Sequence, residues 1–135
     1  MEILLKRAYE PAAPSDGTRV LVDRLWPRGV SRERAALDEW AKEVAPSAEL
    51  RTEWHQDPDG RSSERFEAFA ERYRAELSEG TALAALDRLV SLARSVSRIT
   101  LVYGARDPVL NHAVVLRDAL RDRAEETAPG PSGAH

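Results

Sequence analysis

The sequence predicts an α/β fold: a single domain with a small, mostly parallel sheet of three to four strands and helices packed on its faces. Short apolar runs alternate along the chain with longer segments of helical periodicity, the order that produces parallel strand–helix units. The run at 19–22 is rich in aliphatic and β-branched residues without polar alternation, which is typical of a strand buried on both faces. The length of 135 residues suits one domain and is short for two.

The first quarter of the chain contains two expected strands and their connections. Residues 3–6 predict a strand, and the Pro, Ser, Asp and Gly residues between 11 and 17 predict an irregular connection. Residues 19–22 predict the second strand. The segment 26–29 is expected to be a loop, because its proline lacks an N–H donor and its glycine favours a turn. Ser31 is then expected to cap a short helix.

The segment 37–45 has two interpretations. Its apolar residues fit helical spacing, whereas Pro46 just beyond it favours a short strand around 40–44. A new helix is expected after this proline. Ser47 is expected to cap a helix over 48–54, with a glutamate in the first turn where it suits the helix dipole.

The second half of the chain is expected to contain three helices and one strand. The polar residues 55–60 predict a loop that leads to a long helix over 64–78, where apolar residues recur every three or four positions. Thr81 is expected to cap the next helix. A strand at 99–103 and a final helix over 109–123 complete the predicted fold.

Domain organisation and location follow from the two ends of the chain. We expect residues 1–124 to form the domain and residues 125–135 to form a disordered tail, which is rich in Pro, Gly, Ser and Ala. The N-terminal apolar run is too short for a signal peptide, and no segment approaches the roughly 20 apolar residues of a membrane span. We therefore expect a soluble cytoplasmic protein.

Composition excludes several functional classes. With 20 basic and 23 acidic residues, the net charge of −3 argues against a protein that coats nucleic acid through overall positive charge. The chain has no cysteine, so disulfides, thiolate metal sites and a cysteine nucleophile are excluded. Its three histidines lack the spacing of a metal site, and we expect no bound metal.

Two apolar runs each end in a cluster of polar residues, and the two clusters have the features of one site. In an open α/β sheet, ligands bind outside the carboxyl ends of the strands, where residues after both runs gather. The first cluster is Asp23, Arg24, Trp26 and Arg28, and the second is Gly104, Arg106, Asp107, Asn111 and His112.

The first cluster suggests an anion site. Guanidinium groups held in a loop after a buried strand suit bidentate recognition of carboxylate or phosphate, and Arg24 and Arg28 flank Trp26 in such a loop. The alternative is that Arg24 pairs with Asp23 or Asp38 and that Arg28 is solvated. Surface ion pairs of this kind are common and contribute little.

The second cluster joins a strand to a helix, the position of phosphate-binding turns. It lacks the glycine spacing of a dinucleotide fingerprint and the Gly-Lys-Ser/Thr ending of a P-loop. Free backbone N–H groups at the start of the helix, beginning with Gly104 and helped by Arg106, are still expected to hold one small anion. Asn111 is expected to donate a hydrogen bond to the same ligand, whereas Asp107 has the alternative role of capping the helix.

His112 is the candidate acid–base residue. A histidine near neutral pKa suits proton transfer, with Asp23 or Asp107 to orient its ring. The alternative is a hydrogen-bonded structural histidine, since a helix N-terminus disfavours the charged form. These residues do not decide whether the chain is an enzyme, and they name no cofactor, reaction or oligomeric state.

Several strings together resemble one known family. They are VDRLWPRG at 22–29, APS at 45–47 with ELR at 49–51, Tyr73, and YGARD at 103–107 with NHAVVL at 111–116. Over about residues 1–123 the chain resembles the YeaO-like family, DUF488. The resemblance implies a small bacterial domain of unassigned function, in which the polar residues of both clusters are motif residues.

Three hypotheses about function follow. The first is a domain that binds a small phosphate- or carboxylate-bearing ligand between the two clusters. The second is a non-catalytic interaction module that uses exposed tryptophan and arginine, the residues that most often dominate interfaces. The third is single-stranded nucleic-acid binding by Trp26 between two arginines, against which the net charge argues.

Overall fold

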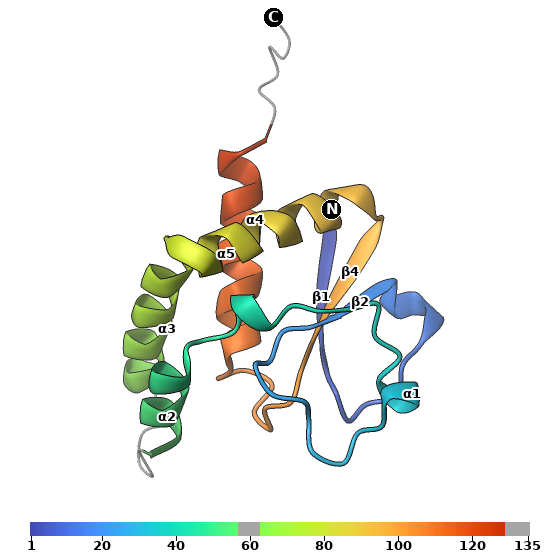
Figure 1. The fold of residues 1–135 in the computed structure, drawn as a ribbon, viewed down its shortest axis with the longest axis horizontal. Helices are drawn as coiled ribbons and strands as arrows, with labels where there is room; N and C mark the ends of the chain where they lie inside the picture. The colour runs from blue at the N-terminus through green and yellow to red at the C-terminus, as the bar shows by residue number, and fades with distance from the viewer. Residues whose placement is uncertain (57–62, 129–135) are drawn as a thin grey trace, which may run out of the picture.

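A parallel sheet forms the centre of the domain (Figure 1). In this computed structural model, which describes residues 1–56 and 63–128, four strands have the order β1-β4-β2-β3 and every neighbouring pair is parallel. The strands are β1 (Glu2–Arg7), β2 (Thr18–Leu21), β3 (Glu39–Trp40) and β4 (Arg98–Tyr103). The single-domain α/β prediction is therefore confirmed, with a sheet that is parallel throughout.

The helices that cover the sheet differ in length between its two sides (Figure 1). They are α1 (Arg32–Ala35), α2 (Ala48–Gln56), α3 (Ser63–Leu77), α4 (Gly80–Ser95) and α5 (His112–Glu126), with 3₁₀ turns at Pro14–Asp16 and Lys42–Val44. The long helices α3, α4 and α5 pack on one face. The short α1 and irregular segments lie on the other.

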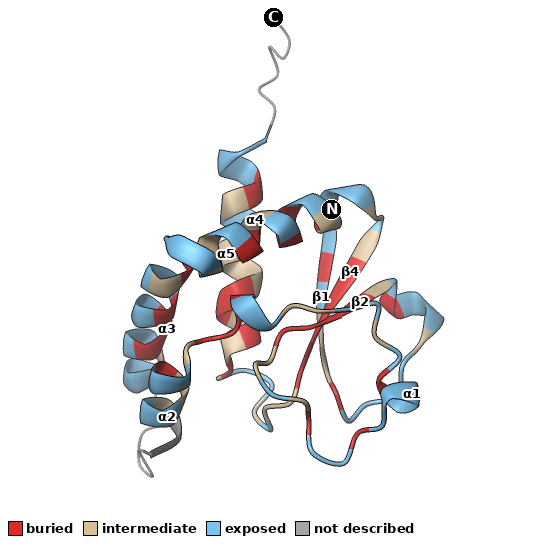
Figure 2. Cartoon of the chain, viewed as in Figure 1, coloured by how far each residue is buried: buried red, intermediate tan, exposed pale blue. Residues whose placement is uncertain are grey.

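Side chains of the central strands alternate between two apolar clusters. Val20 and Leu101 belong to the larger cluster, which the long helices cover, whereas Leu21 and Val102 belong to a smaller cluster on the opposite face. This alternation follows from the two-residue period of a strand. It explains why the strand sequences are continuously apolar, and Figure 2 shows the matching buried stripes on the inward faces of the long helices.

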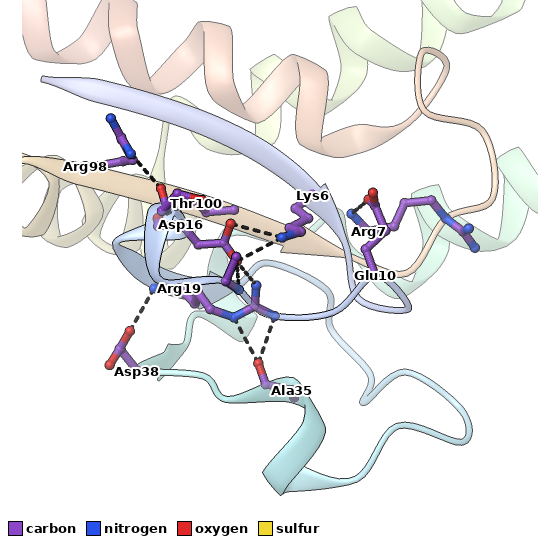
Figure 3. Close-up of polar contacts among 11 residues, drawn as sticks. Lys6, Arg7, Glu10, Asp16, Arg19, Ala35, Asp38, Arg98 and Thr100 are labelled. Carbon is purple, nitrogen blue, oxygen red and sulfur yellow. Dashed lines mark hydrogen bonds and ion pairs between the residues drawn. The ribbon is translucent and has the colours of Figure 1, made fainter.

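A network of buried charged side chains lies beside β2, next to the smaller apolar cluster (Figure 3). Asp16 and Arg19 are 5% and 3% exposed, and the Arg19 Nη1 donates to Asp16 Oδ2 at 2.6 Å. Lys6 donates to the same carboxylate, and the Arg19 Nε and Nη2 donate to the carbonyl of Ala35. The Thr100 hydroxyl donates to the Asp16 carbonyl. The network thus connects β1, β2, β4 and α1.

The ambiguous segment 37–45 forms both a strand and a turn. Glu39–Trp40 is the short strand β3, because the N–H groups of Asp38 and Ala41 on either side donate to carbonyls of β2. A 3₁₀ turn at Lys42–Val44 follows. The strand is therefore earlier and shorter than the expected segment at 40–44.

Two of the three predicted helix caps are confirmed. The Ser31 hydroxyl accepts a hydrogen bond from the Arg34 N–H at the start of α1. The Ser47 hydroxyl accepts from the Leu50 N–H before α2. The prediction for Thr81 is wrong, because the carbonyl of Glu79 already accepts the first helical hydrogen bond and Thr81 lies inside α4.

Three other boundaries differ from those expected. Helix α2 continues through Gln56, so the predicted polar loop begins later, and its residues 57–60 lie outside the described residues. Helix α5 begins at His112 rather than 109, because side chains of the preceding turn take the N–H groups there. It ends at Glu126, two residues into the predicted tail, whose residues 129–135 lie outside the described part.

Candidate ligand-binding site

A pocket of about 470 Å³ lies at the carboxyl ends of the strands. Its lining includes Tyr9 after β1, residues 23–27 after β2, residues 45–46 after β3 and residues 104–107 after β4. Helices α2, α3 and α5 complete its wall. The structure thus brings together the two clusters that the sequence places after separate strands, at the edge where open parallel sheets bind ligands.

Asp23 connects the two clusters. Its Oδ2 accepts a hydrogen bond from the Gly104 N–H at 2.9 Å, across 81 residues of sequence. A Cβ at position 104 would lie 2.9 Å from the same oxygen, so a side chain there would displace the carboxylate. Glycine at this position therefore permits the close approach of the two loops, and its N–H is already occupied.

His112 fixes the start of α5 to the end of β2. Its Nε2 lies 3.0 Å from the Val22 carbonyl and 3.1 Å from Asp23 Oδ1. A carbonyl oxygen only accepts hydrogen bonds, so we assign the proton to Nε2. This geometry gives the half-buried ring a structural role. Its acid–base role with Asp23 stays a prediction.

Tyr73 contacts both His112 and the segment before α2. It is fully buried on α3, its hydroxyl donates to the Val44 carbonyl, and its ring meets the His112 ring edge-on. Burial, followed by the negative charges of Glu76 and Asp23, raises the pKa of the Tyr73 hydroxyl well above its usual value. The hydroxyl therefore stays protonated and supports the segment before α2.

Arg24 is held by backbone carbonyls. Its Nε donates to the Pro46 carbonyl and its Nη2 to the Ala45 carbonyl, both at 3.1 Å. The alternative pairing with Asp23 or Asp38 is not observed, and the Asp38 carboxylate instead accepts the N–H of Arg19. These carbonyls orient the guanidinium, and among the described residues it forms no ion pair with a carboxylate.

Arg51, on the fourth position of α2, adds a second cation to the pocket wall. Its Nε is buried and has no hydrogen-bond partner within the described residues. No ion pair with a described carboxylate is recorded for it either. A buried guanidinium N–H without an acceptor is costly, so it calls for a partner that the described protein atoms do not supply.

The remaining predicted arginines lie in different surroundings. Arg106 is exposed and lines the pocket. Arg28 is exposed but is not among the lining residues, and its backbone carbonyl accepts the Tyr9 hydroxyl. Arg24 and Arg106 therefore line the pocket and Arg28 does not, and the ligand-binding role of Arg28 stays a prediction.

Side chains of the turn before α5 accept three of the backbone N–H groups there. Asp107 Oδ1 accepts from Val109 and Leu110, and Asn111 Oδ1 accepts from Val114 as the helix cap. The Asn111 amide donates back to the Asp107 carbonyl. The N–H groups of Gly104, Val109, Leu110 and Val114 are thus occupied, and Asn111 rather than Asp107 caps the helix.

Trp26 is half-buried at the pocket edge. Its indole Nε1 donates to the Val30 carbonyl at 2.6 Å, and its ring packs edge-on against Trp40 at 5.4 Å. Arg32 lies 5.3 Å from the ring centroid. The indole therefore forms part of a packed cluster with only one part open to the pocket.

Within 1–56 and 63–128, no three His, Cys, Asp or Glu side chains are grouped so as to hold a metal ion. None of the helices in this part of the chain combines the length and apolar character that crossing a membrane requires.

Comparison with known proteins identifies the family. The model described as "Inactive DUF488-N3 subclade" matches residues 2–134. The chain belongs to this DUF488-N3 subclade. It is 45% identical over 121 residues to "Uncharacterized protein YeaO" of Escherichia coli K12, covering 90% of this chain and 98% of that protein.

Mycobacterial relatives of this DUF488-N3 chain are similarly close. "Uncharacterized protein Rv3073c" of Mycobacterium tuberculosis H37Rv and "Uncharacterized protein Mb3100c" of Mycobacterium bovis are each 43% identical over 121 residues. Both matches cover 90% of this chain and 95% of the relative. No solved structure matches the chain. The resemblance to DUF488 seen in the sequence motifs is therefore confirmed.

Sequence patterns do not mark Arg51, Tyr9 or Phe69 as residues of this DUF488-N3 site. The helix over 48–54 was expected, but its periodicity did not show which side chain faces the sheet edge. A signal was present, because Arg51 lies in the ELR string that carries part of the family resemblance. The pocket wall also includes Trp54 from α2 and Phe69 from α3.

Proposed function

We propose that the chain binds a small phosphate- or carboxylate-bearing ligand in the pocket at the carboxyl ends of its strands. The observation that carries this proposal is the buried Nε of Arg51, which has no acceptor in the described protein and belongs to a pocket-lining residue. An anion in the pocket supplies the missing acceptor. Guanidinium groups suit this task because they bind carboxylate and phosphate through two parallel hydrogen bonds.

The charges around the pocket support the same ligand. Arg24, Arg51 and Arg106 line it, and none of them has a recorded ion pair with a carboxylate of the described residues. The lining carboxylates Asp23 and Asp107 instead accept backbone N–H groups. Three arginines without an ion-paired carboxylate among the described residues favour an anion.

Binding without bond making is favoured over catalysis. The proton that we assign to His112 Nε2 donates to the Val22 carbonyl, so a general acid would have to use another group. The family description also calls the subclade inactive. We therefore assign His112 and the Oδ2 atom of Asp23 to positioning the loops around the ligand.

The other two hypotheses receive less support from the geometry. An interaction module and a stacking platform for nucleic acid both need an open tryptophan face beside free arginines. Trp26 is instead half-buried and packed against Trp40. Arg24 is turned toward the carbonyls of residues 45–46.

Thermal unfolding with a panel of anions tests the proposal. A bound anion at ten times its Kd stabilises the fold by about 1.4 kcal/mol, which raises Tm by about 4 °C for a domain of this size. We expect phosphate, a phosphate ester or a carboxylate to produce such a shift, and Arg51→Gln to abolish it. Arg28→Gln is the matched control, since it removes an exposed arginine outside the pocket.

Two results would overturn the proposal. One is the absence of a shift with every anion of the panel in the wild-type protein. The other is an equal shift in wild type and Arg51→Gln, which would place the anion elsewhere on the surface.

A further inference from the structure

The pocket is much larger than an inorganic anion requires. Its volume of about 470 Å³ falls within the roughly 300–1,000 Å³ of pockets that hold whole organic ligands. A water molecule takes up about 30 Å³ of liquid, and one phosphate would leave most of this pocket unfilled. The anion is therefore expected to be one end of a larger molecule.

Aromatic side chains form part of the wall. Trp54 and Phe69 line the pocket from α2 and α3, and their ring centroids are 5.0 Å apart. Phe66 packs against both rings, at 5.8 Å from Trp54 and 6.0 Å from Phe69, and so restricts their motion. Tyr9 adds a partly exposed ring from the end of β1. Such rings favour a planar ligand, because stacking needs two flat surfaces.

Two unsatisfied polar atoms specify the ligand further. Within the described residues, Asp23 Oδ1 and Arg51 Nε are the buried side-chain atoms that have no hydrogen-bond partner. Both belong to pocket-lining residues. One is an acceptor and the other a donor, so a single molecule with an N–H group and an anionic group satisfies both.

The contact of Asp23 with His112 leaves this need in place. His112 Nε2 lies 3.1 Å from Oδ1, close enough for an ion pair, but its hydrogen points to the Val22 carbonyl. The other oxygen, Oδ2, accepts the Gly104 N–H. Oδ1 is thus the part of the carboxylate left for a ligand donor.

From these observations we infer that the ligand is a planar ring bearing an N–H donor, joined to a phosphate or carboxylate group. Nucleoside monophosphates and amino-substituted aromatic acids share this chemistry. The ring stacks on Trp54, which Phe69 supports, its N–H donates to Asp23, and its anion binds Arg51. This inference rests on the proposed anion site and adds the chemistry of the rest of the ligand.

Isothermal titration calorimetry of the full chain tests the inference with matched ligand pairs. The phosphate arm compares AMP with ribose 5-phosphate for the ring, and with purine riboside 5′-monophosphate for the amino group. The carboxylate arm compares 4-aminobenzoate with benzoate. We expect one arm to show binding that is about tenfold tighter with the aminated ring than with its matched partner, a gain typical of a single buried hydrogen bond or stacked ring.

Two variants locate the contacts. Trp54→Leu is expected to remove the advantage of AMP over ribose 5-phosphate while the binding of inorganic phosphate persists. Asp23→Asn keeps an oxygen for the Gly104 N–H but presents an NH₂ group in place of Oδ1, so it is expected to remove the preference for the amino group. If Trp54→Leu does not fold, Tyr9→Leu and ligand quenching of tryptophan fluorescence report on the same wall.

The outcomes separate the two proposals. Suppose that phosphate or benzoate binds at Arg51 but neither aminated ring binds more than about threefold more tightly than its matched partner, a gain smaller than one hydrogen bond contributes. In that case the ligand inference is wrong and the anion site stands. If no ligand or inorganic anion binds the wild-type protein, both are wrong. An unchanged amino-group preference in Asp23→Asn would also contradict the inference.

Discussion

The imidazole Nε2 of His112 lies 3.1 Å from Oδ1 of Asp23, and this contact joins the first turn of α5 to the loop after β2. The same loop is held from β4 by the hydrogen bond of the Gly104 N–H to Asp23 Oδ2. Two oxygens of one carboxylate thus contact segments that are more than 80 residues away in sequence. The pocket owes its shape to these two contacts.

Replacing His112 is expected to loosen this junction. His112→Ala leaves the Val22 carbonyl without its ring donor and removes the contact with Asp23, which costs about 1–2 kcal/mol of unfolding free energy. Urea denaturation measures the loss. Arg121→Ala, on an exposed position of the same helix, is the control and is expected to change stability by less than about 0.5 kcal/mol. Equal stability of both variants would contradict the structural role of His112.

Gly104→Ala is expected to separate the two loops. The new methyl group would lie 2.9 Å from Asp23 Oδ2, an overpacked contact that costs about 1–3 kcal/mol. A double-mutant cycle with Asp23→Ala isolates the cause, because the penalty falls when the carboxylate is absent. A penalty that is the same in both backgrounds would show that the strain arises from another neighbour.

Tyr73→Phe is expected to destabilise the fold by about 1–3 kcal/mol, since it leaves the buried Val44 carbonyl without its donor. Tyr9→Phe is the matched control. The Tyr9 hydroxyl donates to the carbonyl of exposed Arg28, where water replaces it at little cost. Chemical denaturation of both variants checks the difference, and a similar small effect in each would contradict the burial argument.

Asp16 is expected to make stability depend on acid pH. Burial by itself raises the pKa of its carboxyl, but hydrogen bonds from Ala13, Lys6 and Arg19 outweigh burial and hold this pKa below its ordinary value. A depressed folded-state pKa contributes stability above the unfolded pKa of about 3.9, and this contribution is lost as pH falls through the folded value.

Asp16→Asn is therefore expected to lower the unfolding free energy by about 3 kcal/mol at pH 7, because Arg19 keeps its buried charge without a partner. The difference from wild type is expected to shrink below about pH 4. Denaturation curves at pH 7, 5 and 3 measure it, with Asp122→Asn on the exposed face of α5 as control. A difference that stays constant with pH would contradict the ionised role of Asp16.

The strands and long helices follow from local sequence patterns. Apolar runs at 19–22 and 99–103 and the periodic residues of 64–78 predict elements that the structure contains within one or two residues. The meeting of the two polar clusters is also predictable, because parallel strands end at one edge of a sheet. These predictions need only the spacing of apolar residues along the sequence and the parallel direction of the strands.

Side-chain direction within the site depends on tertiary contacts that sequence patterns do not show. The sequence gives no reason to distinguish Arg24 from Arg28, since both follow the same strand. Only Arg24 donates hydrogen bonds to the carbonyls of residues 45–46, which lie 21 and 22 residues further along the chain. Gly104 offers its N–H to Asp23 rather than to an anion for the same reason. Arg51 reaches the pocket because the Ser47 cap sets where α2 begins, and with it the face that this residue occupies.

A crystal of the chain soaked in phosphate tests anion binding at Arg51 most directly. The proposed function predicts a phosphate in the pocket with an oxygen within about 3 Å of the Arg51 guanidinium, a normal hydrogen-bond distance, and no such ion in crystals of Arg51→Gln. A pocket that holds only water at saturating phosphate, with Arg51 paired to a carboxylate of the protein, would contradict it.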